Sequence, residues 1–209
     1  MSGANLMGLT KRTGADLLLF GVTAVELGIL ATLTPTFSLA DWIYLCQHLL
    51  VLGLALVRRP PTSLDTSFSA LAACAVAYAY PYAQLLYLRL VPGYPASQVA
   101  GDTLVTLAAG LNLTSLHALG RWFGIRPALR GLATAGPYRI VRHPLYLSYF
   151  IADVGFNLQL WNWGTLLMVG IGWGSLLLRI RAEERVLAQD PGWPAYAAAV
   201  RSRLVPGVW

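Results

Sequence analysis

The chain has 209 residues, of which 56% are apolar and only 11% charged, and its formal net charge is +6. Soluble globular domains carry about 25% charged residues, so this composition excludes an ordinary soluble domain. It predicts an integral membrane protein with a single membrane domain, residues 1–209. The two cysteines and three histidines show no metal-ligand spacing, so we expect no metal site.

Six apolar runs predict an all-α integral membrane protein with about six transmembrane helices, because a helix needs about 20 apolar residues to cross a bilayer. In chain order the runs cover about residues 16–33, 42–57, 68–88, 102–119, 145–160 and 164–178. The first run is long enough to span and lacks a convincing cleavage site, so we interpret it as a helix rather than a signal peptide. Pro81 lies inside the third run, where it can kink or break the helix.

The last two runs are joined by the short segment Trp161-Asn162-Trp163-Gly164. Such a tight connection predicts a helical hairpin whose tryptophans lie at a membrane interface. Pro144 suits the first turn of the earlier helix of this hairpin. We therefore expect His143 and Pro144, where one helix begins, to lie beside Arg179, where the other ends.

The basic residues predict the orientation of the chain. Threading six spans places all but Arg89 of the 15 lysines and arginines on one side of the membrane. The positive-inside rule makes that side cytoplasmic, together with both termini and the polar segment around His143. The positive charge then reflects topology and anionic lipid headgroups, and we expect no nucleic-acid partner.

Three ionisable residues fall deep within the predicted spans: Glu26, His48 and Asp153. Ionisable groups inside a membrane are costly, which makes each a candidate functional residue. The alternative is a structural polar contact between helices. The sequence does not tell whether the three side chains meet.

Two polar clusters lie at the predicted cytoplasmic face, one within residues 130–146 and one within residues 179–185. Arg179 and Glu183 are four residues apart and share a helix face. A carboxylate such as Glu183 can accept hydrogen bonds from a ribose or an amino group, and tyrosine rings suit a sulfonium cation. Arg142 and His143 can meet a carboxylate beside a helix amino end. The alternative is a basic belt that only contacts lipid.

The order of the motifs adds a family resemblance. The strings Leu119-Gly120-Arg121, Gly136-Pro137-Tyr138 and Arg142-His143-Pro144-Leu145-Tyr146 are followed by Arg179, Glu183-Glu184 and the Trp193/Tyr196 tail. Over about residues 116–206 this pattern resembles the isoprenylcysteine carboxyl methyltransferase family, and more broadly the membrane phospholipid and thiol methyltransferases. The resemblance divides the chain into N-terminal transmembrane helices, residues 1–115, and a cofactor-binding region, residues 116–209.

The resemblance implies an S-adenosyl-L-methionine cofactor, bound at the cytoplasmic end without a Rossmann domain. The positions that it assigns to the cofactor are Arg130, Gly131, Leu132, Ala133, Tyr138, Arg142, His143, Pro144, Leu145, Tyr146 and Glu183. It assigns to Arg179 the catalytic position facing the carboxylate of the acceptor. The implied partners are a hydrophobic or lipid-like methyl acceptor and membrane lipids.

Several alternatives stay open at this level. The acceptor group can be a carboxylate, a thiol or an amine, and a thiol or amine would need a base such as His143 or Glu183. A membrane NADPH-dependent sterol-type reductase shares a similar C-terminal arrangement and would use Arg121, Arg126 and Arg130 for a phosphate. A non-enzymatic accessory or transport protein resembling NnrU is the third reading. The oligomeric state is not predicted.

Overall fold

The computed structural model describes Gly21, Gly28 and residues 39–208. The predicted first span, with Glu26, lies outside these residues. The chain divides into two compact units, Met1–Val57 and Arg58–Trp209. In the described part of the first unit, helix α3 (Leu39–Val57) covers the predicted second span and contains His48.

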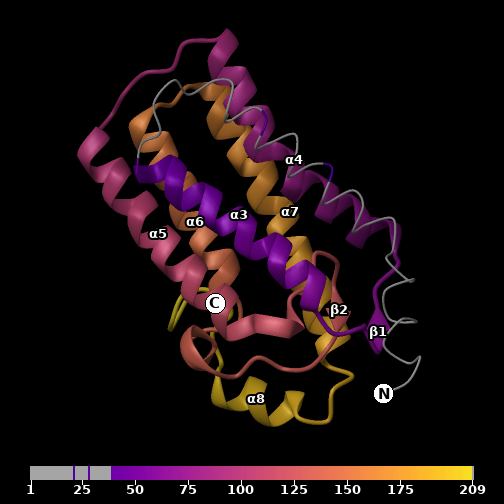
Figure 1. The fold of residues 1–209 in the computed structure, drawn as a ribbon. Coiled ribbons are helices and arrows are strands. Elements are labelled where there is room, and N and C mark those ends of the chain that lie inside the picture. The colour runs from indigo at the N-terminus through magenta and orange to yellow at the C-terminus, as the bar shows by residue number, and fades with distance from the viewer. Residues whose placement is uncertain (1–20, 22–27, 29–38, 209) are drawn as a thin grey trace. The chain divides into compact units, whose positions relative to one another are not determined.

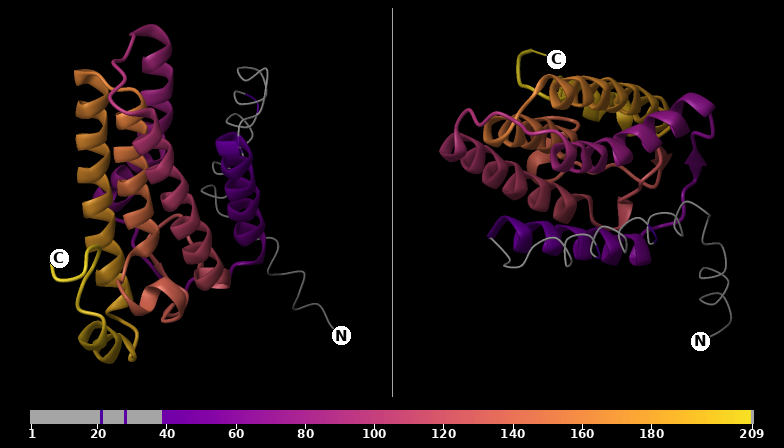
Figure 2. Two further views of the ribbon diagram at one scale, coloured as in Figure 1. Left: turned by 90° about the vertical axis from the view of Figure 1, so that its left-hand side faces the viewer. Right: turned by 90° about the horizontal axis from the view of Figure 1, so that it is seen from above.

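The second unit is built on four long helices that correspond to the remaining predicted spans. They are α4 (Phe68–Leu90), α5 (Gln98–Leu119), α6 (Pro144–Gln159) and α7 (Trp163–Leu187). Helix α5 packs along α6, and α4 packs along α7 (Figure 1 and Figure 2). The hairpin expected from the sequence is present, but each of its helices finds its main packing partner outside the hairpin.

Three segments of the described chain are long and apolar enough to cross a membrane: Phe68–Leu88, Gln98–Trp122 and Trp163–Leu187. Helix α6 has 16 residues, which is shorter than the usual span. The chain is therefore an integral membrane protein by the length and composition of its helices, and the total of six spans stays a prediction.

Polar side chains at the helix starts explain where the helices begin. Ser67 caps α4 and Ser97 caps α5, each by accepting a hydrogen bond from a backbone N–H in the first turn. Asn162 and Thr165 form a reciprocal capping box at the start of α7. Helix α4 continues through Pro81 without a break.

The end of the second unit that carries the predicted site is closed by short elements. Strand β1 (Ser63–Leu64) pairs antiparallel with β2 (Ala128–Leu129), so the fold is mostly helical rather than all-α. The prediction missed this pair because two-residue strands leave no periodic pattern. The 3-10 helices η1 (Gly120–Trp122) and η2 (Gly136–Arg139) and helix α8 (Trp193–Ala199) complete this end.

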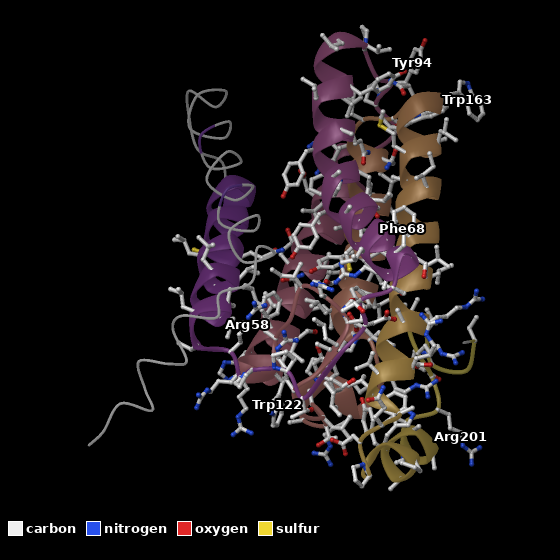
Figure 3. All side chains as sticks on the ribbon, turned by 90° about the vertical axis from the view of Figure 1, so that its right-hand side faces the viewer. Arg58, Phe68, Tyr94, Trp122, Trp163 and Arg201 are labelled. Atoms are coloured by element: carbon white, nitrogen blue, oxygen red, sulfur yellow. The ribbon has the colours of Figure 1, made fainter. Side chains whose placement is uncertain are left out.

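The two ends of the second unit carry different side chains. Figure 3 shows the labelled Arg58, Trp122 and Arg201 at one end, and Tyr94 and Trp163 at the opposite end. Trp161 and Trp163 pack edge to face beside Tyr94, as expected of aromatic side chains at a membrane interface. This arrangement agrees with the predicted threading of the basic residues, while the cytoplasmic orientation itself stays a prediction.

Asp153 makes a polar contact between three helices. Its Oδ2 accepts hydrogen bonds from the Tyr80 hydroxyl of α4 at 2.7 Å and from the Trp173 indole of α7 at 2.8 Å. Both donors hold a carboxylate that is buried within α6. The contact favours the structural reading of Asp153 over a role in transport.

The close packing of α5 on α6 generates a test of the fold. A Cβ at Gly101 would lie 2.8 Å from the Gly155 carbonyl oxygen, whereas a Cβ at Gly110, on the same helix, would meet nothing within 4 Å. We expect Gly101→Ala to destabilise the protein by about 1–3 kcal/mol, because the helix backbones must separate. Thermal unfolding of the detergent-purified protein measures the loss.

Gly110→Ala is the matched control, and it should leave the melting temperature unchanged or slightly raised, since alanine has the higher helix propensity. Equal melting temperatures for the two variants would contradict the described approach of α5 and α6.

Candidate functional site

The predicted site lies where α6 begins and α7 ends. Pro144 occupies the first helical turn of α6, and no side chain caps the helix there, because His143 at the N-cap position makes no such bond. The backbone N–H groups of this turn therefore keep donor capacity. Five side chains gather here, which we name the polar cluster: His143, Tyr146, Arg179, Glu183 and Glu184.

Glu183 connects the two helices on one side of His143. The Tyr146 hydroxyl donates a hydrogen bond to Glu183 Oε1, and Arg179 Nη2 lies 3.8 Å from the same oxygen. Glu183 Oε2 lies 3.9 Å from His143 Nδ1 and makes no hydrogen bond within the described part of the chain. One carboxylate oxygen thus remains available for a donor on a ligand.

Glu184 holds the opposite side of the same imidazole. Its Oε1 lies 3.3 Å from His143 Nε2 and 3.2 Å from Arg142 Nε. Its Oε2 accepts a hydrogen bond from Arg203 Nε at 2.8 Å. Because a carboxylate only accepts, His143 carries its proton on Nε2 in this contact. Glu184 therefore fixes the orientation of the ring between two carboxylates.

Arg179 is a buried guanidinium within the polar cluster. Its Nη2 donates to the Ile125 carbonyl at 2.7 Å, and its Cζ lies 5.2 Å from the ring centre of Tyr146. Its Nε is buried and has no hydrogen-bond partner among the described residues. A buried donor without a partner is costly, so this side chain is suited to receive an anionic group.

The segment before α6 is covered by α8. Tyr138 is buried, and burial raises the pKa of its hydroxyl well above the usual value. The Tyr196 hydroxyl of α8 donates to the Tyr138 carbonyl at 2.9 Å, and burial raises the pKa of Tyr196 to about 12. Arg142 lies over the Trp193 ring at 5.7 Å. Both hydroxyls are therefore neutral donors at physiological pH.

The sequence predicted a cofactor-binding region that includes the C-terminal tail, but not the individual contacts of residues 202–204 with the site. The N–H groups of Arg142 and His143 donate to the carbonyls of Ser202 and Arg203. Leu204 packs into a buried cluster with Tyr146, Leu176 and Ile180. No spacing pattern connects residues so distant in sequence, and only the basic character of Arg203 was visible beforehand.

The segment 130–133 lies at the same end of the unit. Arg130 is buried, and its Nε donates to the Arg59 carbonyl at 3.1 Å. Gly131 has a φ of +136°, and a Cβ there would lie 2.6 Å from the Trp122 indole nitrogen, so both its conformation and its packing require glycine. The negative charge of Glu183 acts on the Arg130 guanidinium, so residues 130–133 lie within electrostatic reach of the polar cluster.

The structure brings five of the twelve predicted site residues together. His143, Tyr146, Arg179 and Glu183 contact one another, and Arg142 joins them through Glu184. Tyr138, Pro144 and Ala133 are buried. The search of the described residues finds no group of three or more possible metal ligands.

Residues 103–189 match the model of the isoprenylcysteine carboxyl methyltransferase (ICMT) family. This segment is therefore similar to the ICMT family. It begins within α5, contains the whole polar cluster and ends just after α7. The match supports a membrane methyltransferase. Helix α8 and the C-terminal tail lie beyond the matched segment, and no curated protein matches the chain.

The contacts of Glu184 generate a test of the tail. Arg203 pairs with Glu184 at 2.8 Å with 32% of its side chain exposed, whereas Arg185 pairs with Asp65 at 3.2 Å with 66% exposed. We expect Arg203→Ala to cost about 1.5–3 kcal/mol of unfolding free energy, because a charged hydrogen bond on a largely buried carboxylate is lost.

Arg185→Ala is the control, and it should cost at most about 1 kcal/mol, as exposed ion pairs do. Chemical denaturation in mild detergent measures both variants. A loss of unfolding free energy for Arg185→Ala that exceeds the loss for Arg203→Ala would contradict the expected contribution of the Arg203–Glu184 pair.

Proposed function

We propose that the chain is an S-adenosylmethionine-dependent membrane methyltransferase that acts on the carboxylate of a hydrophobic, isoprenylcysteine-like acceptor. The observation that supports it is the polar cluster, in which a buried arginine with a free donor and a glutamate with a free oxygen lie within the segment that matches the ICMT family. The family supports a methyltransferase, and the chemistry of these side chains supports the donor and the acceptor group.

The donor set fits S-adenosylmethionine. Glu183 Oε2 would accept from an amino or ribose hydroxyl group, and the uncapped first turn of α6 would receive the carboxylate. The rings of His143 and Tyr146 stack at 5.8 Å beside Glu183. Bound there, this cofactor supplies an electrophilic methyl group on a sulfonium.

Arg179 would hold the acceptor. A carboxylate is ionised at neutral pH and needs no base, and arginine holds it without giving up a proton. The role of the chain is then to place the acceptor oxygen in line with the bond between the methyl carbon and the sulfonium sulfur, and to exclude water. The Ile125 carbonyl keeps Arg179 fixed. Positioning of this kind contributes about 7–11 kcal/mol in well-oriented reactions.

The location of the polar cluster fits a lipid-borne acceptor. It lies where α6 begins and α7 ends, so an apolar chain could enter between the helices while the cofactor enters from the aqueous side. The predicted threading makes this side cytoplasmic. The proposed partners are the hydrophobic acceptor and membrane lipids, without nucleic acid.

The first prediction concerns the cofactor. We expect Glu183→Ala and His143→Ala to abolish both methyl transfer and the thermal stabilisation that S-adenosylmethionine gives the wild-type protein, since each removes a proposed contact. At 100 times its dissociation constant a ligand stabilises by about 2.7 kcal/mol. The measurement is a thermal unfolding series in detergent with S-adenosylmethionine, its demethylated product and NADPH.

Arg201→Gln, an exposed change of charge at the same end, is the control and should respond like the wild type. Stabilisation of the wild type by NADPH and not by S-adenosylmethionine would contradict the proposal and favour the reductase reading.

The second prediction separates the acceptor from the cofactor. We expect Arg179→Gln to retain stabilisation by S-adenosylmethionine and to lose at least about 100-fold in turnover, because a buried charge that holds the acceptor is removed. Radiolabelled methyl transfer to a farnesylcysteine analogue measures turnover. Equal loss of cofactor binding and turnover would remove the separate role of Arg179.

A further inference from the structure

The outward face of α7 marks where the apolar surface of the second unit ends. Leu167, Ile171 and Leu178 are exposed at the spacing of a single helix face. Arg181 and Arg185 continue the same face and are also exposed. Because exposed leucine and isoleucine suit lipid while guanidiniums need water or headgroups, the edge of the bilayer on this face falls between Leu178 and Arg181.

The C-terminal tail reaches this edge. Leu204 belongs to one buried cluster with Leu176 and Ile180 of α7, the residues that lie on either side of the edge along the helix. Figure 2 shows the yellow tail turning back from α8 beside the long helices. The residues that follow Leu204 therefore lie at the level where the apolar surface of α7 gives way to charge.

The tail forms a turn that displays apolar side chains. The Val208 N–H donates to the Val205 carbonyl at 3.1 Å, and Gly207 has a φ of +78°, as the third residue of a type II turn requires. The Gly207 N–H also donates to Ser202 Oγ at 3.1 Å, which ties the turn to the preceding residues. Within this turn Val205 is 44% and Val208 78% exposed. The turn thus presents an apolar surface that no described residue covers.

Position and charge indicate what covers the turn. Arg201, just before the tail folds onto α7, is exposed, as is Arg181 at the edge of the bilayer. Interfacial segments combine apolar side chains that enter the acyl-chain boundary with cations that meet anionic headgroups. The turn also lies at the end of the α7 surface that suits lipid. Both observations favour a lipid surface over a protein partner.

We propose that the turn Val205–Val208 is an interfacial anchor, which inserts its valines into the boundary of the bilayer while Arg201 meets anionic headgroups. The partner is the lipid surface itself. The anchor is independent of which cofactor or acceptor the polar cluster binds.

The anchor connects the bilayer to the polar cluster through the tail. The carbonyls of Ser202 and Arg203 accept from the N–H groups of Arg142 and His143, and Arg203 Nε donates to Glu184. These contacts precede the anchored turn by only a few residues. Insertion of the turn therefore holds the tail against the beginning of α6.

Depth-dependent quenching locates the turn. Val208→Cys, in a Cys46→Ser background because Cys74 is buried, carries an environment-sensitive fluorophore in nanodiscs of phosphatidylcholine and phosphatidylglycerol that contain a nitroxide lipid. Gln189→Cys, exposed just beyond α7, is the matched control. We expect blue-shifted emission and strong quenching by the nitroxide lipid at position 208, and weak quenching at position 189.

Two results of this measurement would overturn the anchor. One is equal quenching at the two positions, which would place the turn in water. The other is a probe at position 208 that is shielded from aqueous iodide but not quenched by the nitroxide lipid, because protein would then cover the turn.

Release of the tail tests the connection to the polar cluster. Trypsin cleaves after arginine, so cleavage after Arg203 reports how often the tail opens. We expect the double change Val205→Ser and Val208→Ser to speed this cleavage in nanodiscs about tenfold, since cleavage follows the population of the opened tail and the anchor has lost apolar groups. Val99→Ser, which alters an exposed valine at the opposite end, should leave the rate unchanged. An unchanged rate in the double variant would mean that lipid does not hold the tail.

Discussion

The site depends on the pair of adjacent glutamates near the end of α7. Glu183 lies near Nδ1 of His143 and Glu184 near Nε2, so the last part of α7 contacts both sides of the imidazole where α6 begins. Glu183 also reaches Tyr146 and Arg179, while Glu184 reaches Arg142 and Arg203. These ionic contacts act together with the apolar packing of Tyr146 against Leu176 and Ile180 where the two helix ends meet.

Contacts elsewhere in the unit hold α6 and α7 in place at this point. The close approach of α5 to α6 at Gly101 and Gly155 holds α6, and the Asp153 contacts hold it against α4 and α7. The loop between α5 and α6 presents the Ile125 carbonyl to Arg179, and it pairs through β2 with the segment after Arg58. Rigid support of this kind is what a reaction that relies on positioning requires.

Positive charge is distributed unevenly around this centre. Arg142, Arg203 and Arg179 are compensated wholly or in part by the two glutamates, whereas Arg130 has no contacting acid in the described part of the chain. Arg130 is therefore less compensated by the described acids than the other three arginines are.

The sequence by itself determined the membrane class, the bounds of α3 to α6 to within a few residues and the two clusters around His143 and Glu183, because apolar periodicity and local motifs depend on nearby residues. The last predicted span ended at residue 178, whereas α7 continues to Leu187. The short turn at Asn162 even made the meeting of the two clusters predictable. Only the tertiary structure decided that Glu184 clamps the ring, that the tail at Ser202 closes the site and that Arg130 has no acid beside it. Those facts arise from contacts between residues far apart in sequence, which no local pattern encodes.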